Sequence, residues 1–233
     1  MDRNLTLDSH SENQAIQSFV TNVFGWMTIG LIVTAVTAWY SLDSGLSYRI
    51  GQNFPLLIGL VIAEVALVLG LVHFLNHLNA ALATGGFLLY SLLTGLTLSV
   101  ILLQYTSTSV TNVFITTAVM FGAMAAYGYT TKKDLTSWGK LLIMGLIGII
   151  VASLLNIFIL KSSMMHLLIS YVGVVVFVGL TAYDTQKIKM MGAEMSASDP
   201  ENYRKSAIMG ALALYLDFIN LFVMLLRIMG DRD

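Results

Sequence analysis

The chain has 233 residues, of which 57% are hydrophobic and only 11% are charged, and its mean hydropathy is +0.80. This composition excludes a soluble globular domain and is typical of a membrane protein. The net charge of −1 does not indicate a partner, and no basic stripe suggests binding to nucleic acid. The lack of cysteine excludes disulfides, thiolate metal sites and cysteine catalysis.

The first eighteen residues are polar and slightly acidic, and Arg3 is their only basic residue. They lack the basic start of a signal peptide, and no small-residue cleavage site follows the first apolar run. We therefore expect residues 1–18 to form a short polar cytoplasmic tail. We expect residues 19–233 to form a single seven-helix transmembrane domain whose first span is retained.

Seven apolar segments are each long enough to cross a bilayer as a helix. They cover residues 19–42, 54–73, 78–103, 110–129, 141–160, 164–187 and 206–229. Polar connections separate them, and the longest, residues 188–205, is too short for a soluble domain. The sequence therefore predicts an all-α integral membrane protein.

The distribution of lysine and arginine predicts the orientation of the chain. With a cytoplasmic N-terminus, eight basic residues lie on the cytoplasmic side: Arg3, Lys132, Lys133, Lys140, Lys187, Lys189, Arg204 and Lys205. Four lie on the other side: Arg49, Lys161, Arg227 and Arg232. Seven spans then place the C-terminus outside.

Small residues predict where helices pack closely. Gly145, Gly148 and Ala152 form a track on the fifth span, and Gly173 and Gly179 lie on the sixth.

Asp217 lies near the middle of the last apolar segment, where an acid costs about 2.5–3.5 kcal/mol and usually marks function. It shares one helix face with small and polar residues, whereas the leucines of the segment, such as Leu212 and Leu221, lie elsewhere. That face comprises Ser206, Gly210, Ala213, Asp217, Asn220, Met224 and Arg227. We interpret it as the face that points into a helix bundle. Structural hydrogen bonding is the alternative role for Asp217.

Asp184 lies near the end of the sixth span, one turn before Lys187. It can cap that span and pair with Lys187, or it can meet Asp217 of the following span. Two carboxyls in contact cannot both stay ionised, and they titrate as a unit that often shares a proton. Such a pair is a natural pH switch: protonated, it joins two helices; deprotonated, it repels them and offers oxygen ligands to a cation such as Ca²⁺.

The other polar groups allow a functional and a structural interpretation. Glu64, ten residues into the second span, is either a station on an ion pathway or a hydrogen-bonding partner within the bundle. Arg227 fits an arginine that reaches the membrane interface. His73 and His77 have helical spacing, but Phe74 stands where a zinc protease needs glutamate. No nucleophile or nucleotide-binding motif occurs, so we expect neither an enzyme nor a cofactor.

Several long segments resemble the Bax inhibitor-1 (transmembrane Bax inhibitor motif) family, in particular its bacterial inner-membrane branch. They are FGAMAAYGYTTKKDLTSWG, YVGVVVFVGLTAYDTQKIK and GALALYLDFINLFVMLLRIMG. The resemblance implies six helices wrapped around a central C-terminal helix, in the bacterial inner membrane, and a pH-sensitive calcium leak. It also implies that Asp184 in TAYDTQ and Asp217 in YLDFIN form the sensing pair, with transient Ca²⁺ contact.

The resemblance extends to further residues and to partners. Glu64 occupies a place comparable to a glutamate reported in some members. Asn220, on the same face of the last span as Asp217, is the other candidate residue for the ion pathway. An arginine of the second helix that latches the closed state in some relatives has no match here. Expected partners are the bilayer, calcium ions and protons. The alternative functions are a regulator of a membrane-anchored AAA protease, acting through helix contacts and the accessible tail, and a proton-coupled transporter.

Overall fold

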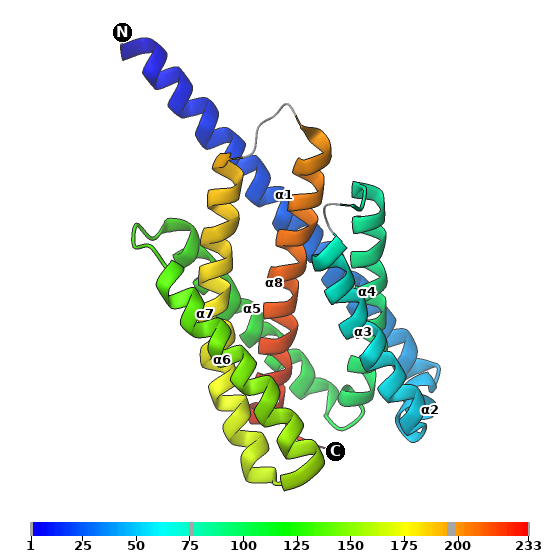
Figure 1. The fold of residues 1–233 in the computed structure, drawn as a ribbon. Coiled ribbons are helices and arrows are strands. Elements are labelled where there is room, and N and C mark those ends of the chain that lie inside the picture. Colours follow the sequence, from blue (N-terminus) through cyan, green and yellow to red (C-terminus); the bar gives the residue numbers. More distant parts are fainter. Residues whose placement is uncertain (1, 75–76, 195–198, 233) are drawn as a thin grey trace. The chain divides into compact units, whose positions relative to one another are not determined.

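The computed structural model describes the backbone of residues 2–74, 77–194 and 199–232, and within these the side chains from residue 13 onward. The regular structure of this part is helical (Figure 1). The helices are α1 (Asp2–Asp43), α2 (Leu46–Gln52), α3 (Phe54–Phe74), α4 (Ala80–Leu102), α5 (Ser107–Thr130), α6 (Thr136–Leu155), the π-helical turn η1 (Asn156–Leu160), α7 (Ser163–Glu194) and α8 (Pro200–Met229).

Seven helical segments of the described chain are long and apolar enough to cross a membrane. They are Asn13–Asp43, Phe54–Phe74, Ala80–Leu102, Ser107–Thr130, Thr136–Leu160, Ser163–Glu194 and Pro200–Met229. The prediction of an all-α protein with seven spans is therefore confirmed. The central place of the C-terminal helix stays a prediction.

Two helices extend well beyond the limits expected from the apolar runs. α7 continues to Glu194 and α8 begins at Pro200, so the long connection expected at residues 188–205 is largely helical. Strong helix formers such as Lys, Met, Ala and Glu follow Lys187 and continue the helix past the apolar span. Likewise α1 begins at Asp2, so the backbone of the expected polar tail is helical; Met1 and the side chains of residues 2–12 lie outside the described part.

Polar side chains at the helix ends explain several of these boundaries. Asn79 accepts a hydrogen bond from the amide of Leu82 (2.8 Å) where α4 begins, and Thr106 accepts one from Ser109 (3.2 Å) where α5 begins. Asp199 accepts from the amide of Asn202 (3.0 Å), directly before Pro200 at the first position of α8. These are the residue types that satisfy free amides at helix starts.

The chain divides into two compact units, and α7 and α8 contribute to both. The first comprises residues 1–104 and 190–215, and the second comprises residues 105–189 and 216–233.

In the first unit, α4 packs against α1 and α3 (Figure 1). A Cβ on Gly95 of α4 would lie 2.8 Å from the carbonyl oxygen of Thr34 in α1, so the small residue allows the two backbones to approach. Ser99 donates to Ser41 (3.0 Å) across the same pair of helices. The ring of Phe19 in α1 meets that of Tyr203 in α8 edge-on, 5.2 Å between centroids.

In the second unit, α7 packs against α5, α6 and the second half of α8 through small residues. A Cβ on Gly128 of α5 would collide with the carbonyl of Ala182 in α7, and one on Gly139 of α6 with the ring of Tyr183. Gly173 and Gly179 of α7 contact Met224 and Leu142, as predicted from their size.

The predicted small-residue track on the fifth span is only partly correct. A Cβ on Gly145 would lie 3.1 Å from Val176, but one on Gly148 would meet nothing within 4 Å. Gly148 is exposed, so it makes no close helix contact in this structure.

Replacement of Gly128 by valine is expected to destabilise the second unit, because the new side chain meets a backbone carbonyl that cannot rotate away. Overpacking of this kind costs roughly 1–3 kcal/mol. The midpoint of thermal unfolding in detergent should fall for Gly128→Val. Gly122→Val is the matched control, since Gly122 lies on the same helix with nothing within 4 Å of its Cβ position. An equal loss in both variants would contradict the close approach.

Candidate functional site

The second unit brings Asp184 of α7 and Asp217 of α8 together, a contact that the sequence left open. Their side-chain carboxyls are hydrogen-bond partners. A carboxylate only accepts hydrogen bonds, so at least one of the two must carry a proton for this bond to form. The pair is therefore a place where one proton can join α7 to α8.

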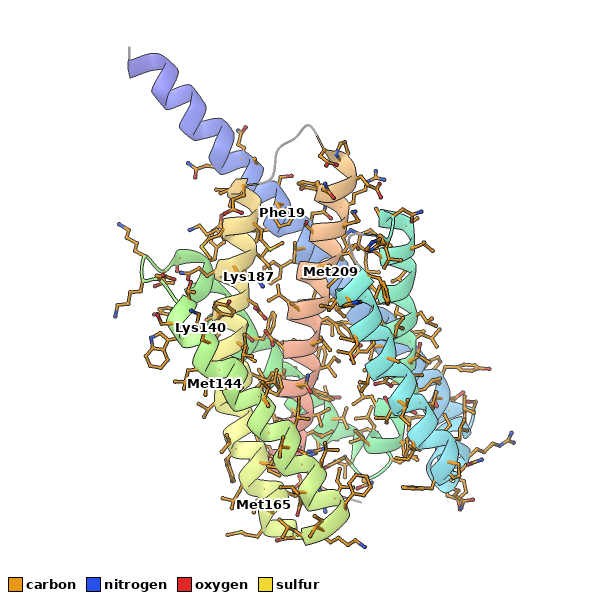
Figure 2. The ribbon with its side chains drawn as sticks, viewed as in Figure 1. Phe19, Lys140, Met144, Met165, Lys187 and Met209 are labelled. Carbon is orange, nitrogen blue, oxygen red and sulfur yellow. The ribbon has the colours of Figure 1, made fainter. Side chains whose placement is uncertain are left out.

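The two acids lie in different surroundings. Asp217 is 4% exposed, and its Oδ2 atom has no hydrogen-bond partner in the described part of the chain. Asp184 is half-buried, and the ammonium group of Lys187, one turn further along α7, acts on it electrostatically. Figure 2 shows Lys187 on α7. The interaction with Lys187 and the contact with Asp217 therefore coexist, although the sequence presented them as alternatives.

The helix packing described above fixes the position of Asp184. Gly128 and Gly139 contact Ala182 and Tyr183, the two residues directly before it. The hydroxyls of Thr181 and Thr185 donate to carbonyls of their own helix, at 2.8 and 2.7 Å. These hydroxyls therefore do not donate hydrogen bonds to the carboxyl pair.

Sequence reasoning missed the polar residues that hold the α5–α6 connection against α7. Gln186 donates from Nε2 to the carbonyl of Lys133 and accepts at Oε1 from the amide of Leu135, both at 2.8 Å. Lys189 donates to the carbonyl of Tyr129 (2.8 Å) and lies 5.0 Å from the centre of its ring. A glutamine within an apolar span was the only signal for this contact, because its partners lie more than fifty positions earlier.

The α5–α6 connection also carries an exposed acid, Asp134. Hydrogen bonds from the hydroxyl and the amide of Thr136 hold the pKa of Asp134 below its usual value. Its carboxylate is therefore charged at neutral pH and stands apart from the buried pair.

Glu64 belongs to the first unit, whereas the carboxyl pair belongs to the second. It is half-buried and accepts a hydrogen bond at Oε1 from the hydroxyl of Thr97 (2.8 Å). Tyr90 and Tyr215 lie within its electrostatic reach. Glu64 is thus a satisfied polar group in this state, and its place on an ion pathway stays a prediction.

Asn220 lies one turn after Asp217 on α8, but its amide donates to the carbonyl of Leu216 (2.8 Å) in its own helix. Its role on an ion pathway also stays a prediction. The tyrosines next to the two acids in sequence have other contacts. Tyr215 shares a hydrogen bond with Thr34 (2.5 Å), and the ring of Tyr183 packs over Gly139.

The sequence suggested that the polar face of α8 is the one that points into the bundle. In the structure, other faces of α8 are buried as well. Leu212, Leu221 and Leu225, which lie off that face, are also buried. The apolar side chains of α8 are enclosed together with the polar ones, so the position of Asp217 on the polar stripe does not by itself define the interior.

The carboxyl pair can exchange a proton and can offer oxygen atoms to a cation, but it is not a complete metal site. Two carboxylates supply four oxygens, whereas Ca²⁺ takes about six to eight. The described residues contain no group of three or more His, Cys, Asp or Glu side chains placed to hold a metal. Any contact with Ca²⁺ would therefore be transient and completed by water.

The fold and the buried pair define a class: a polytopic helical membrane protein with an acidic contact between two of its spans. Residues 16–233 match the family model described as inhibitor of apoptosis-promoting Bax1. The chain is 52% identical over 234 residues to inner membrane protein YbhL of Escherichia coli (strain K12), with 100% of both chains covered. A protein of Borreliella burgdorferi is 44% identical over 230 residues, covering 97% of this chain and 98% of its own.

The chain therefore belongs to the Bax inhibitor-1 family, as the sequence segments predicted. A membrane protein of Streptococcus pyogenes is a further relative, 43% identical over 155 residues and 66% of each chain.

Substitution of Gln186 by leucine is expected to loosen the α5–α6 connection, because the carbonyl of Lys133 and the amide of Leu135 lose their partner. An unpaired buried polar group costs about 1–3 kcal/mol, so amide exchange should become about ten- to hundredfold faster. Hydrogen–deuterium exchange of residues 131–136 measures this. Lys187→Gln, at an exposed neighbouring position, should leave exchange there unchanged; acceleration in the control alone would contradict the assignment.

Proposed function

We propose that this protein is a pH-sensitive cation leak whose gate is the Asp184–Asp217 pair, with Ca²⁺ as the permeant ion. The observation that carries the proposal is the contact of two carboxyls on two spans of the second unit. Family membership supports it, because the resemblance implied the same two residues as the sensor.

The proposed mechanism follows from the unequal surroundings of the two acids. Burial disfavours a charged carboxylate, and a nearby ammonium group favours one. The proton therefore resides on the enclosed Asp217, while the charge resides on Asp184 near Lys187. Loss of the shared proton leaves two repelling carboxylates, which separate α7 from α8 and expose oxygen ligands to the cation.

Glu64 and Asn220 are proposed as further stations of the ion. Glu64 is the only carboxylate on α3, and its single hydrogen bond from Thr97 leaves its second oxygen available to a cation. The amide oxygen of Asn220 is likewise available, since its hydrogen bond to Leu216 uses the nitrogen.

The proposed location is the inner membrane of a bacterium, with the N-terminus in the cytoplasm and the C-terminus outside. The printed name of the Escherichia coli relative supports the location. The excess of lysine and arginine on one side of the seven spans supports the orientation.

Reconstitution in liposomes tests the gate. We expect Ca²⁺ flux through the wild-type protein to change with pH around neutrality, as the pair gains or loses its proton. Asp184→Asn and Asp217→Asn should each make the flux independent of pH, because an amide does not titrate. A calcium-sensitive dye enclosed in the liposomes measures both.

Asp134→Asn is the control, since it removes a carboxylate of the same unit that is exposed and far from protonation at these pH values. It should retain the wild-type pH profile. Unchanged profiles in both pair variants would refute the gate. Absence of any flux would favour the alternative function, regulation of a membrane-anchored protease, which deletion of residues 1–18 would then test.

A further inference from the structure

The first unit has a groove at the end where α8 begins, between α1, α4 and α8. Two hollows of about 360 and 750 Å³ form it, and both are lined by Asn22 of α1 and Arg204 of α8. These volumes lie in the range of about 300–1,000 Å³ that is usual for small-molecule sites.

The polar side of the groove carries a positive charge. Of the residues that the structure describes, Arg204 is the only charged one that lines either hollow. Among the described residues, neither its guanidinium nor the amide of Asn22 has a recorded hydrogen-bond partner. The neighbouring acids are occupied: Glu201 accepts from the amide of Ala80 (2.6 Å), and Asp199 from that of Asn202 (3.0 Å). Arg204 is exposed and Asn22 half-buried, and a guanidinium and an amide that line the same hollow match phosphate oxygens.

The rest of the larger hollow is apolar except for Thr84, whose hydroxyl donates to the carbonyl of Ala80 (2.8 Å) in its own helix. Ala81, Gly85 and Leu88 of α4 form one wall, and Trp26 of α1 and Ile208 of α8 complete it. Ala81 and Gly85 are exposed, and a Cβ on Gly85 would meet nothing within 4 Å. The groove therefore opens along the exposed side of α4, one of the helices that are long and apolar enough to cross a membrane.

We infer that this groove binds one anionic phospholipid, with the phosphodiester at Arg204 and Asn22 and an acyl chain along Ala81, Gly85 and Leu88. A soluble anion would satisfy only the polar end. A phospholipid matches both the polar end and the apolar wall, because its charged head group and its acyl chain are parts of one molecule. The inference does not rest on the Asp184–Asp217 pair, which lies in the other unit.

Fluorescence of Trp26 tests the inference, because bromine atoms on an acyl chain quench tryptophan on contact. Trp39→Phe and Trp138→Phe leave Trp26 as the only tryptophan of the full chain. The protein is placed in vesicles of brominated phosphatidylglycerol or brominated phosphatidylcholine, each diluted in unbrominated phosphatidylcholine. High salt screens the general attraction of anionic lipid to surface charge.

We expect phosphatidylglycerol to quench Trp26 at a lower mole fraction than phosphatidylcholine. Arg204→Gln should lower this preference at least about tenfold, as expected for loss of a charge-assisted contact. Lys205→Gln, which removes the adjacent positive charge outside the groove, should retain the preference. Equal quenching by both lipids, or equal losses in both variants, would overturn the inference.

A variant of the apolar wall provides an independent readout. Gly85→Leu fills the space beside Trp26 and should abolish quenching by the chain of either lipid. Gly70→Leu, on α3 at a glycine that also has nothing within 4 Å, should not. If soluble glycerol phosphate at millimolar concentration removes the preference for phosphatidylglycerol, the groove binds a soluble anion and the lipid assignment is wrong.

Discussion

The contact between the carboxyls of Asp184 and Asp217 constrains how α7 and the second half of α8 meet in the second unit. Two acids side by side in an apolar interior are stable only with a proton between them. The surrounding packing fixes where Asp184 lies, because Gly128 and Gly139 bring α5 and α6 against the residues directly before it. Gln186, two residues after it, ties the α5–α6 connection to the same helix. The proton-sharing contact is therefore held by helix packing on both of its sides.

The helix that carries Asp217 contributes to both units of the chain. Two residues earlier, Tyr215 shares a hydrogen bond with Thr34 of α1, and its ring meets those of Phe87 and Tyr90 edge-on. One residue after Asp217, Phe218 packs edge-on against Phe114 and Phe121 of α5. The acid is thus bracketed by aromatic anchors in its own helix, and a change in its charge acts on a segment that is otherwise firmly packed.

The sequence predicted the spans well because hydrophobicity alone decides which helices a bilayer accepts. It also singled out Asp184 and Asp217, since a carboxyl in an apolar run is conspicuous. It could not predict that they meet, because the relative depth of α7 and α8 depends on close contacts such as that of Gly173 with Met224. Gln186 was missed because it bonds the backbone carbonyl of Lys133 and the backbone amide of Leu135, and every residue type carries such groups. The groove beside Arg204 requires three helices that are distant in sequence.

A pair of acids suits a switch better than an ion pair between an acid and a base. A lysine beside Asp217 would neutralise it, and such a pair stays ionised over a wide range of pH while its removal is costly. Two carboxyls differ because their second ionisation places like charges in contact, so a single proton decides between attraction and repulsion. Lys187 does not cancel this effect, because it is exposed and acts on Asp184 from outside, leaving Asp217 enclosed. The position of this lysine therefore preserves the proton-dependent contact, whereas a lysine on the buried side of the pair would remove it.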